Sequence, residues 1–176
     1  MKRLVVYQSS TGFTEKYAAW IAEALSCEAK ELKRVRVQEV QECDSVIFGG
    51  WIMGGMISGL DKLQKMKPAK LVVFGVGAMA DSDEYRDKLK EQNHLGQNPF
   101  FYLEGGLSFE KMRFLPKTML KMMYKSLVKK PDKTSEEQEM QRAMAGSFDH
   151  VGRAKIKPLI ACVTGQPEAC EAGHMN

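Results

Sequence analysis

A cluster of hydroxyl side chains and one glycine lies near the N-terminus, where residues 9–14 read SSTGFT. The stretch follows an apolar run at residues 3–7 (RLVVY) and precedes residues 14–25, whose apolar spacing predicts a helix. A helix N-terminus presents unpaired N–H groups and a partial positive charge, so neutral hydroxyls placed there can hold a phosphate without a lysine. The simpler alternative is a helix cap followed by a turn glycine. The six residues are Ser9, Ser10, Thr11, Gly12, Phe13 and Thr14.

Two further loops carry residues suited to a flat ligand. Residues 49–59 read GGWIMGGMISG, where Trp51 can stack on an aromatic ring and Met53 can pack flexibly beside it. The alternative for Trp51 is an anchor that fixes the loop to the core. Residues 75–81 read GVGAMAD, in which small residues allow a ligand to approach the backbone closely.

The elements that would position these loops alternate between strand and helix. Each of the two loops follows a short apolar run that predicts a buried strand. Alternating strands and helices predict βαβ units and a mostly parallel sheet, whose carboxyl edge gathers the loops. We expect strands at 3–7, 28–40 (weak), 44–50, 70–75 and 99–104, and helices at 14–25, 59–66, 82–93, 114–130, 134–145 and 149–162, the last ended or kinked around Pro158.

The stretch at 9–14 is neither a Walker loop nor a GxGxxG turn. It resembles the phosphate loop of the flavodoxin family, whose pattern is hydroxyl-x-Thr-Gly-x-Thr. The resemblance implies an α/β, doubly wound, five-stranded parallel sheet in the order 2-1-3-4-5. It also implies that FMN is the cofactor, with residues 9–14 on its phosphate, 51–55 beside the flavin ring and 77–80 on the pyrimidine edge. The residues thereby implicated in the later loops are Trp51, Ile52, Met53, Gly54, Gly55, Gly77, Ala78 and Met79.

The positive charge is concentrated after the fifth predicted strand. Residues 111–133 contain eight basic residues and one acidic residue, whereas the whole chain has a net charge of +4, so the remainder is net negative. Within this segment four lysines recur every four residues, opposite a Met- and Leu-rich face, which predicts a basic amphipathic helix. Such a helix can lie on an anionic membrane, dock an acidic protein, or only cover the sheet edge. No nucleic-acid-reading motif accompanies the charge, so we expect no nucleic-acid partner. The four lysines are Lys117, Lys121, Lys125 and Lys129.

Residues 103–130 resemble the corresponding segment of a narrower flavodoxin-domain group, which contains menaquinone-dependent protoporphyrinogen oxidase. The resemblance implies a basic helical insertion, residues 111–146, and a quinone or another redox partner. Where that enzyme's second loop carries an Arg-Tyr pair, this chain has residues 52–54 (IMG).

Length and composition predict one domain at 1–163 and a flexible tail at 164–176. No signal peptide or membrane span is recognisable, and we expect four free cysteines in a reducing cytoplasm, with a possible location at the inner membrane face.

No catalytic side-chain set or metal-ligand cluster is recognisable. The first hypothesis is therefore an FMN-dependent oxidoreductase or electron-transfer protein whose chemistry resides in the flavin. Its alternatives are a quinone-dependent protoporphyrinogen oxidase, and a non-catalytic binding or regulatory module that acts through the basic insertion.

Overall fold

A central parallel sheet organises the protein, which is represented by a computed structural model that describes residues 1–107, 114–135, 137–138, 141 and 148–165. The strand order is β2-β1-β3-β5-β6, and the short strand β4 pairs antiparallel with the end of β3. With β4 set aside, this is the expected order of a five-stranded doubly wound sheet, so the predicted fold class is confirmed. The strands are β1 (Arg3–Gln8), β2 (Glu28–Glu31), β3 (Ser45–Met53), β4 (Met56–Ile57), β5 (Leu71–Gly77) and β6 (Phe100–Glu104).

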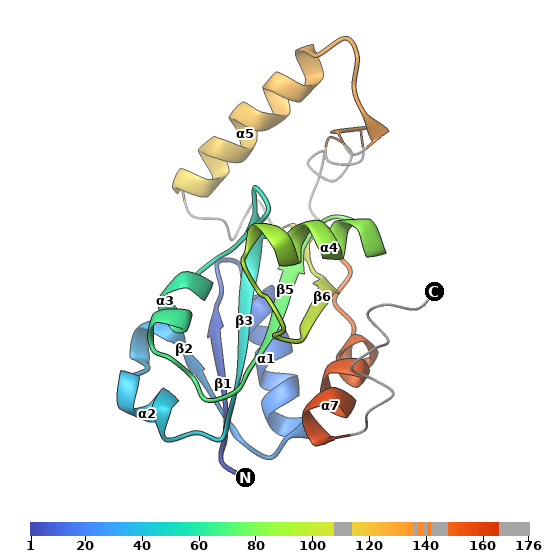
Figure 1. Ribbon diagram of the computed structural model, residues 1–176. Helices are drawn as coiled ribbons and strands as arrows, with labels where there is room; N and C mark the ends of the chain where they lie inside the picture. Colours follow the sequence, from blue (N-terminus) through green and yellow to red (C-terminus); the bar gives the residue numbers. More distant parts are fainter. Residues whose placement is uncertain (108–113, 136, 139–140, 142–147, 166–176) are drawn as a thin grey trace.

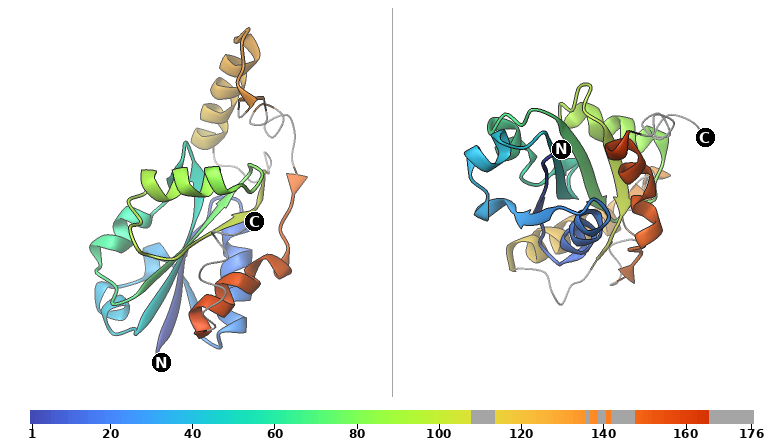
Figure 2. Two further views of the ribbon diagram at one scale, coloured as in Figure 1. Left: turned by 45° about the vertical axis from the view of Figure 1, so that its right-hand side comes forward. Right: turned by 90° about the horizontal axis from the view of Figure 1, so that it is seen from below.

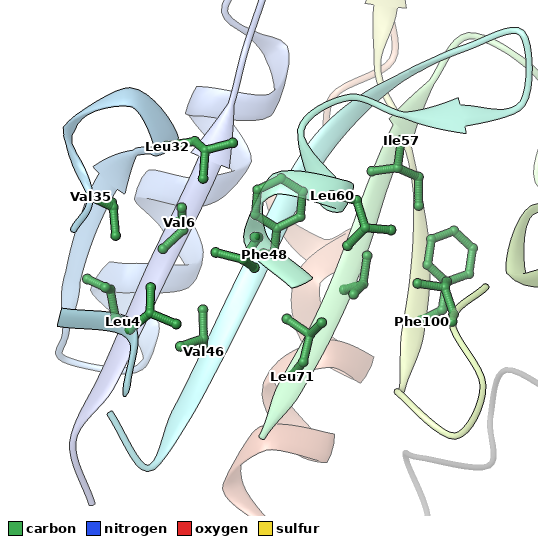
Figure 3. Close-up of a cluster of buried hydrophobic side chains, with 14 of the residues drawn as sticks. Leu4, Val6, Leu32, Val35, Val46, Phe48, Ile57, Leu60, Leu71 and Phe100 are labelled. Atoms are coloured by element: carbon green, nitrogen blue, oxygen red, sulfur yellow. The ribbon is translucent and has the colours of Figure 1, made fainter. Parts of the chain in front are cut away.

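Helices cover both faces of this sheet (Figures 1 and 2). On one face, α1 (Phe13–Ala24) and α7 (Lys157–Thr164) pack over a cluster that includes Tyr17, Ile21 and Leu159. On the other face, α2 (Val37–Gln41), α3 (Leu60–Lys65) and α4 (Asp83–Gln92) enclose the larger cluster drawn in Figure 3. Burial on both faces accounts for the nearly continuous apolar runs of the central strands.

Alternation along β3 assigns each of its side chains to one of these faces. Ile47 belongs to the α1 face, and Phe48 belongs to the α3–α4 face. Gly49 lies beneath the Phe74 ring, which is 1.9 Å from the position a Cβ would take. The glycine is therefore required by packing and does not end the strand.

Two predicted elements are corrected by the structure. The weak strand expected over 28–40 holds only for β2, because the chain then forms a 3-10 turn (Leu32–Arg34) and α2. At the start of α2, the Glu39 carboxylate accepts a hydrogen bond from the Arg36 N–H at 2.9 Å, which favours helix over strand there.

The final helix differs from the prediction as well. The segment expected to be helical from Asp149 instead forms β8 (Phe148–Asp149), a 3-10 turn (Arg153–Ile156) and α7. Pro158 lies in the first turn of α7, where a missing N–H costs no hydrogen bond, so it starts the helix and does not end or kink it.

The insertion leaves and rejoins the domain through a small antiparallel pair. Gly106 of β7 (Gly106–Leu107) pairs with Asp149, and Leu107 pairs with Phe148. Between these strands lies α5 (Phe114–Lys129), which extends beyond the sheet in Figure 1. A capping box stands at residue 134, where a helix is predicted to begin, since Thr134 and Glu137 exchange hydrogen bonds of 3.0 and 3.2 Å. The remainder of the helix predicted to reach 145 lies largely outside the described residues, as does the tail beyond 165.

The cysteines depart in part from the expectation of four free thiols. Cys27 and Cys43 are free, and burial raises the pKa of both thiols. Cys162 is disulfide-bonded, and Cys170 lies outside the described residues.

Candidate functional site

The first loop, residues 9–14, turns from β1 into α1 through a glycine. Gly12 has a φ of +95° and occupies the left-handed region, which an L side chain adopts only with strain. The Ser9 hydroxyl accepts a hydrogen bond from the Gly12 N–H at 3.1 Å and closes the turn. Apart from its two chain neighbours, no atom of the described residues lies within 4 Å of the position that a Cβ on Gly12 would take, so the space before the loop is open to that extent.

The N-terminus of α1 has donors available for an anion. In the part of the chain that the structure describes, no side chain caps this helix, although the sequence supplies several hydroxyls at its start. The helix begins its hydrogen bonding with Lys16 N–H to Gly12 O, which leaves the preceding first-turn N–H groups without a partner in the helix. The nearest helix cation, Lys16, pairs with Asp149 at 4.0 Å and lies 5.3 Å from the centre of the Trp20 ring. The donors of the first loop are therefore neutral amides and hydroxyls, as a phosphate site without lysine requires.

The second loop, residues 51–55, is a continuation of β3 and not the irregular loop expected from its two glycine pairs. Ile52 pairs with Ile57, and Met53 pairs with Met56. The two residues between them, Gly54 and Gly55, have φ values of +59° and +81°. Two successive positive φ angles are those of a type I′ turn, which matches the twist of a hairpin and is readily formed by Gly-Gly.

Successive side chains of the second loop lie on opposite faces of the sheet, because this loop continues strand β3. Ile52 packs on the α3–α4 face, where its Cδ1 lies 2.7 Å from the position of a Cβ on Gly75. Trp51 and Met53 therefore lie on the opposite face, the one that α1 covers. Among the described residues, the Trp51 indole makes no ring–ring or cation–π contact, so its half-buried ring has no aromatic partner in that part of the chain.

Strand register brings the three loops side by side. Gln8, the last residue of β1, pairs with Gly50, so the first loop begins at the level of Trp51. Trp51 in turn pairs with Val76 of β5, directly before the third loop, residues 77–80. All three loops thus lie at the carboxyl edge of neighbouring strands, as predicted.

Asn93, at the end of α4, fastens the second loop. Its side-chain amide donates to Gly55 O and to Leu89 O, both at 2.8 Å, and its Oδ1 accepts from the Ile57 N–H at 2.8 Å. Asn93 is buried, so these bonds form away from water and hold the hairpin to the domain.

Tyr102 of β6 fastens the third loop. Its hydroxyl donates to Met79 O at 2.7 Å, and burial raises the pKa of the phenol, so the donor stays protonated. Gly77 makes room for this ring, because a Cβ there would stand 2.6 Å from the Tyr102 oxygen. Ala78 and Met79 are half-buried and leave their backbone at the sheet edge.

Thr14, a predicted first-loop residue, is buried. The side chain of Phe13 also turns into packing. It joins the cluster on the α1 face, and its ring lies 2.8 Å from the position of a Cβ on Gly106. Phe13 and Ile52 can therefore contribute backbone to a site, while their side chains hold the loops in place.

Sequence reasoning missed the two residues that hold the loops, Asn93 and Tyr102. Asn93 is the last residue of a predicted helix and Tyr102 lies within a predicted strand, so each has an ordinary local explanation. Only the spatial approach of α4 to the hairpin, and of β6 to the third loop, reveals their role.

Metal-ligand groups and membrane-spanning helices are both absent from the described residues. No group of three or more His, Cys, Asp or Glu side chains within them is placed to hold a metal ion. None of the helices in these ranges has both the length and the apolar character that a membrane crossing requires.

Comparison with known proteins finds similar solved structures and a matching family model. No curated protein matches the chain. Solved structures with a similar fold include a flavodoxin from the domain Archaea, with 16% identity over 82% of this chain and 94% of that one, and a TM-score of 0.43. Oxidised Flavodoxin 1 from Bacillus cereus has 17% identity over 68% and 90% of the two chains, with a TM-score of 0.41. A flavoprotein in complex with FMN from Lactobacillus acidophilus NCFM has 14% identity over 58% and 90%, with a TM-score of 0.38.

The model of the flavodoxin domain family matches residues 4–135. This range contains all five strands of the parallel sheet and the three loops at its carboxyl edge. The chain therefore belongs to the flavodoxin domain family.

Proposed function

We propose that this protein binds FMN at the carboxyl edge of its sheet and uses it as an oxidoreductase or electron-transfer protein. The observation that carries the proposal is the uncapped N-terminus of α1, which opens beside Trp51 on one face of the sheet. Membership of the flavodoxin domain family supports a flavin as the ligand of this edge.

The donor set of the first loop fits the FMN phosphate. The first-turn N–H groups of α1 follow the open turn at Gly12, and the half-buried side chains of Ser10 and Thr11 add hydroxyls. The Thr14 side chain is buried and adds no accessible hydroxyl. A dianionic phosphate is stabilised by such donors together with the helix dipole.

The second and third loops would hold the ring system. Trp51 and Met53 offer an indole and a flexible thioether on the face that the first loop shares. Backbone groups of residues 77–80, fixed by Tyr102, would bond the pyrimidine edge. When bound, FMN supplies one- or two-electron redox chemistry, so the protein's own task is to bind, orient and shield it.

The test is to purify the protein and identify any flavin that it carries. We expect a yellow protein that releases FMN on denaturation, or a colourless one that takes up added FMN in a one-to-one complex. A folded protein that neither carries nor binds FMN would overturn the proposal. It would favour the second candidate, a non-catalytic flavodoxin-fold module whose functional surface is α5.

A finer activity that we propose is quinone-coupled oxidation of a porphyrinogen. Its support is the resemblance of residues 103–130 to the insertion of the quinone-dependent enzyme, together with an insertion framed by β7 and β8. In that reaction electrons and protons removed from the porphyrinogen reduce a quinone to a quinol. Absence of porphyrin formation by the FMN-loaded protein with quinone would reject this activity while leaving FMN binding intact.

A further inference from the structure

The insertion helix α5 has a basic side and an apolar side. In its sequence, FLPKTMLKMMYKSLVK, lysines occupy every fourth position and no carboxylate interrupts them. At the ideal helical rotation of about 100° per residue, the four lysine positions fall within an arc of about 120°. The positions of Met119, Met123 and Leu127 lie away from this arc, Met122 borders it, and Val128 lies within it. Lys121, Lys125 and Lys129 are exposed.

Apolar groups on this helix also reach solvent. Met122 is 67% exposed and Val128 is 47% exposed, two of the few large apolar side chains with such exposure among the described residues. Burying exposed apolar area is favourable, so this combination is suited to an interface.

The position of α5 adds a third observation. The helix extends past the carboxyl edge of the sheet, and the tip of the β3–β4 hairpin reaches the same end of the molecule (Figures 1 and 2). On that hairpin Met56 is 55% exposed. Apolar groups from two separate elements are therefore presented at one end, beside a row of positive charges.

We propose that α5 docks this end of the protein on an anionic lipid bilayer. Lysine is depleted in protein–protein interfaces, where arginine and aromatic residues dominate, whereas four lysines around a Met- and Leu-rich face match a headgroup layer above acyl chains. The lysine stems can lie along the lipid surface with their ammonium groups at the phosphates. The helix binds parallel to the surface and does not cross it.

Docking through α5 brings the three loops of the carboxyl edge close to the lipid surface. The inference goes beyond FMN binding and does not depend on it, because the vesicle measurement below needs no flavin.

The test is co-sedimentation of the full-length protein with phosphatidylcholine vesicles that contain about 30% phosphatidylserine, and with pure phosphatidylcholine vesicles. The test variant changes Lys117, Lys121, Lys125 and Lys129 to Gln. The matched control changes Lys62, Lys65, Lys67 and Lys70 to Gln, which removes the same charge from exposed positions at the end of α3 and before β5. Far-UV circular dichroism confirms that both variants fold.

We expect the wild type to bind the anionic vesicles and to release them at high salt. The four-lysine variant of α5 should bind about 100-fold more weakly, and the control variant should bind nearly as well as the wild type. Met122→Gln should weaken binding about fivefold, while Val37→Gln, at a similarly exposed site on α2, should have no effect. Failure of the wild type to bind anionic vesicles, or equal loss in both lysine variants, overturns the proposal. Binding to polyglutamate but not to vesicles also overturns it, in favour of an acidic protein partner.

Discussion

Asn93 holds Gly55 by a 2.8 Å hydrogen bond from its side-chain amide to the glycine carbonyl. The two residues are 38 positions apart, and the bond joins the end of α4 to the turn of the β3–β4 hairpin. The same side chain accepts from the Ile57 N–H, so one buried amide fixes both sides of the turn. A loop proposed to contact a flavin is thereby attached to the rigid part of the domain.

Removal of this amide should destabilise the protein strongly for a single substitution. Asn93→Ala deletes three hydrogen bonds and leaves the buried Ile57 N–H without its partner. The expected loss in the free energy of unfolding is about 2–3 kcal/mol, measured by urea titration. Asn98→Ala, which deletes one bond to Leu95 O, serves as the control and should cost about 1 kcal/mol. Equal effects of the two substitutions would mean that Asn93 does not clamp the hairpin.

The Tyr102 hydroxyl should matter for FMN affinity because it fixes the third loop through Met79 O. Tyr102→Phe keeps the ring packed and removes only this bond. We expect FMN to bind about fivefold more weakly, in line with one lost hydrogen bond of about 1 kcal/mol. Fluorescence titration of FMN measures this effect. Tyr124→Phe on α5 is the control, and a loss of affinity in that variant to the same extent would contradict the assignment.

The positive φ of Gly12 allows the stability cost of an added Cβ to be separated from its effect on FMN affinity. Gly12→Ala and Gly96→Ala both place a Cβ at a positive φ, +95° and +56°, where the described residues beyond the chain neighbours leave 4 Å free. Each should therefore cost about 1–2 kcal/mol of stability. Only Gly12→Ala should weaken FMN binding, by about tenfold, because its methyl group enters the space proposed for the phosphate. Unchanged FMN affinity in Gly12→Ala would remove the phosphate from this loop.

The ion pair between Glu104 and Lys155 predicts a pH dependence of stability. The hydrogen bond from Lys155 lowers the pKa of the Glu104 carboxyl, so its stabilising contribution is present above the unfolded-state pKa of about 4.3 and is lost as pH falls through the folded-state pKa. Both side chains are about a third exposed, at 31% and 33%, which limits the contribution to about 0.5–1 kcal/mol.

The measurement for this pair is the difference in unfolding free energy between wild type and Glu104→Gln. The difference should be largest near pH 7 and should be lost as pH falls through the lowered folded-state pKa of Glu104. A difference that stays constant over this range would show that the carboxylate charge contributes nothing.

The sequence was sufficient to predict the central sheet, because β1, β3, β5 and β6 are apolar runs bounded by polar residues or turns. It was misleading at Gly49 and Gly50, which suggested the end of a strand. Gly49 is required by the Phe74 ring, and Gly50 by the returning hairpin, whose Ser58 O lies 2.5 Å from the position of a Cβ. Local sequence contains no signal for such contacts, because they depend on residues brought close only by folding.

In the candidate site too, some residues are indicated by a sequence pattern and others only by contacts that folding creates. The hydroxyls and Gly12 of the first loop were visible as a pattern, and the register then placed Trp51 beside that loop. The roles of Asn93 and Tyr102 could not be predicted, since neither belongs to a motif and each acts across a gap in sequence.

The most direct test of the central claim is a comparison of FMN and riboflavin affinity for the wild-type protein by isothermal titration calorimetry. The two ligands differ only by the phosphate, which the first loop is proposed to hold through the N-terminus of α1. FMN should bind about 100-fold more tightly than riboflavin, as expected for two charge-assisted hydrogen bonds. Equal affinity for both ligands, or no binding of FMN by the folded protein, would contradict the account.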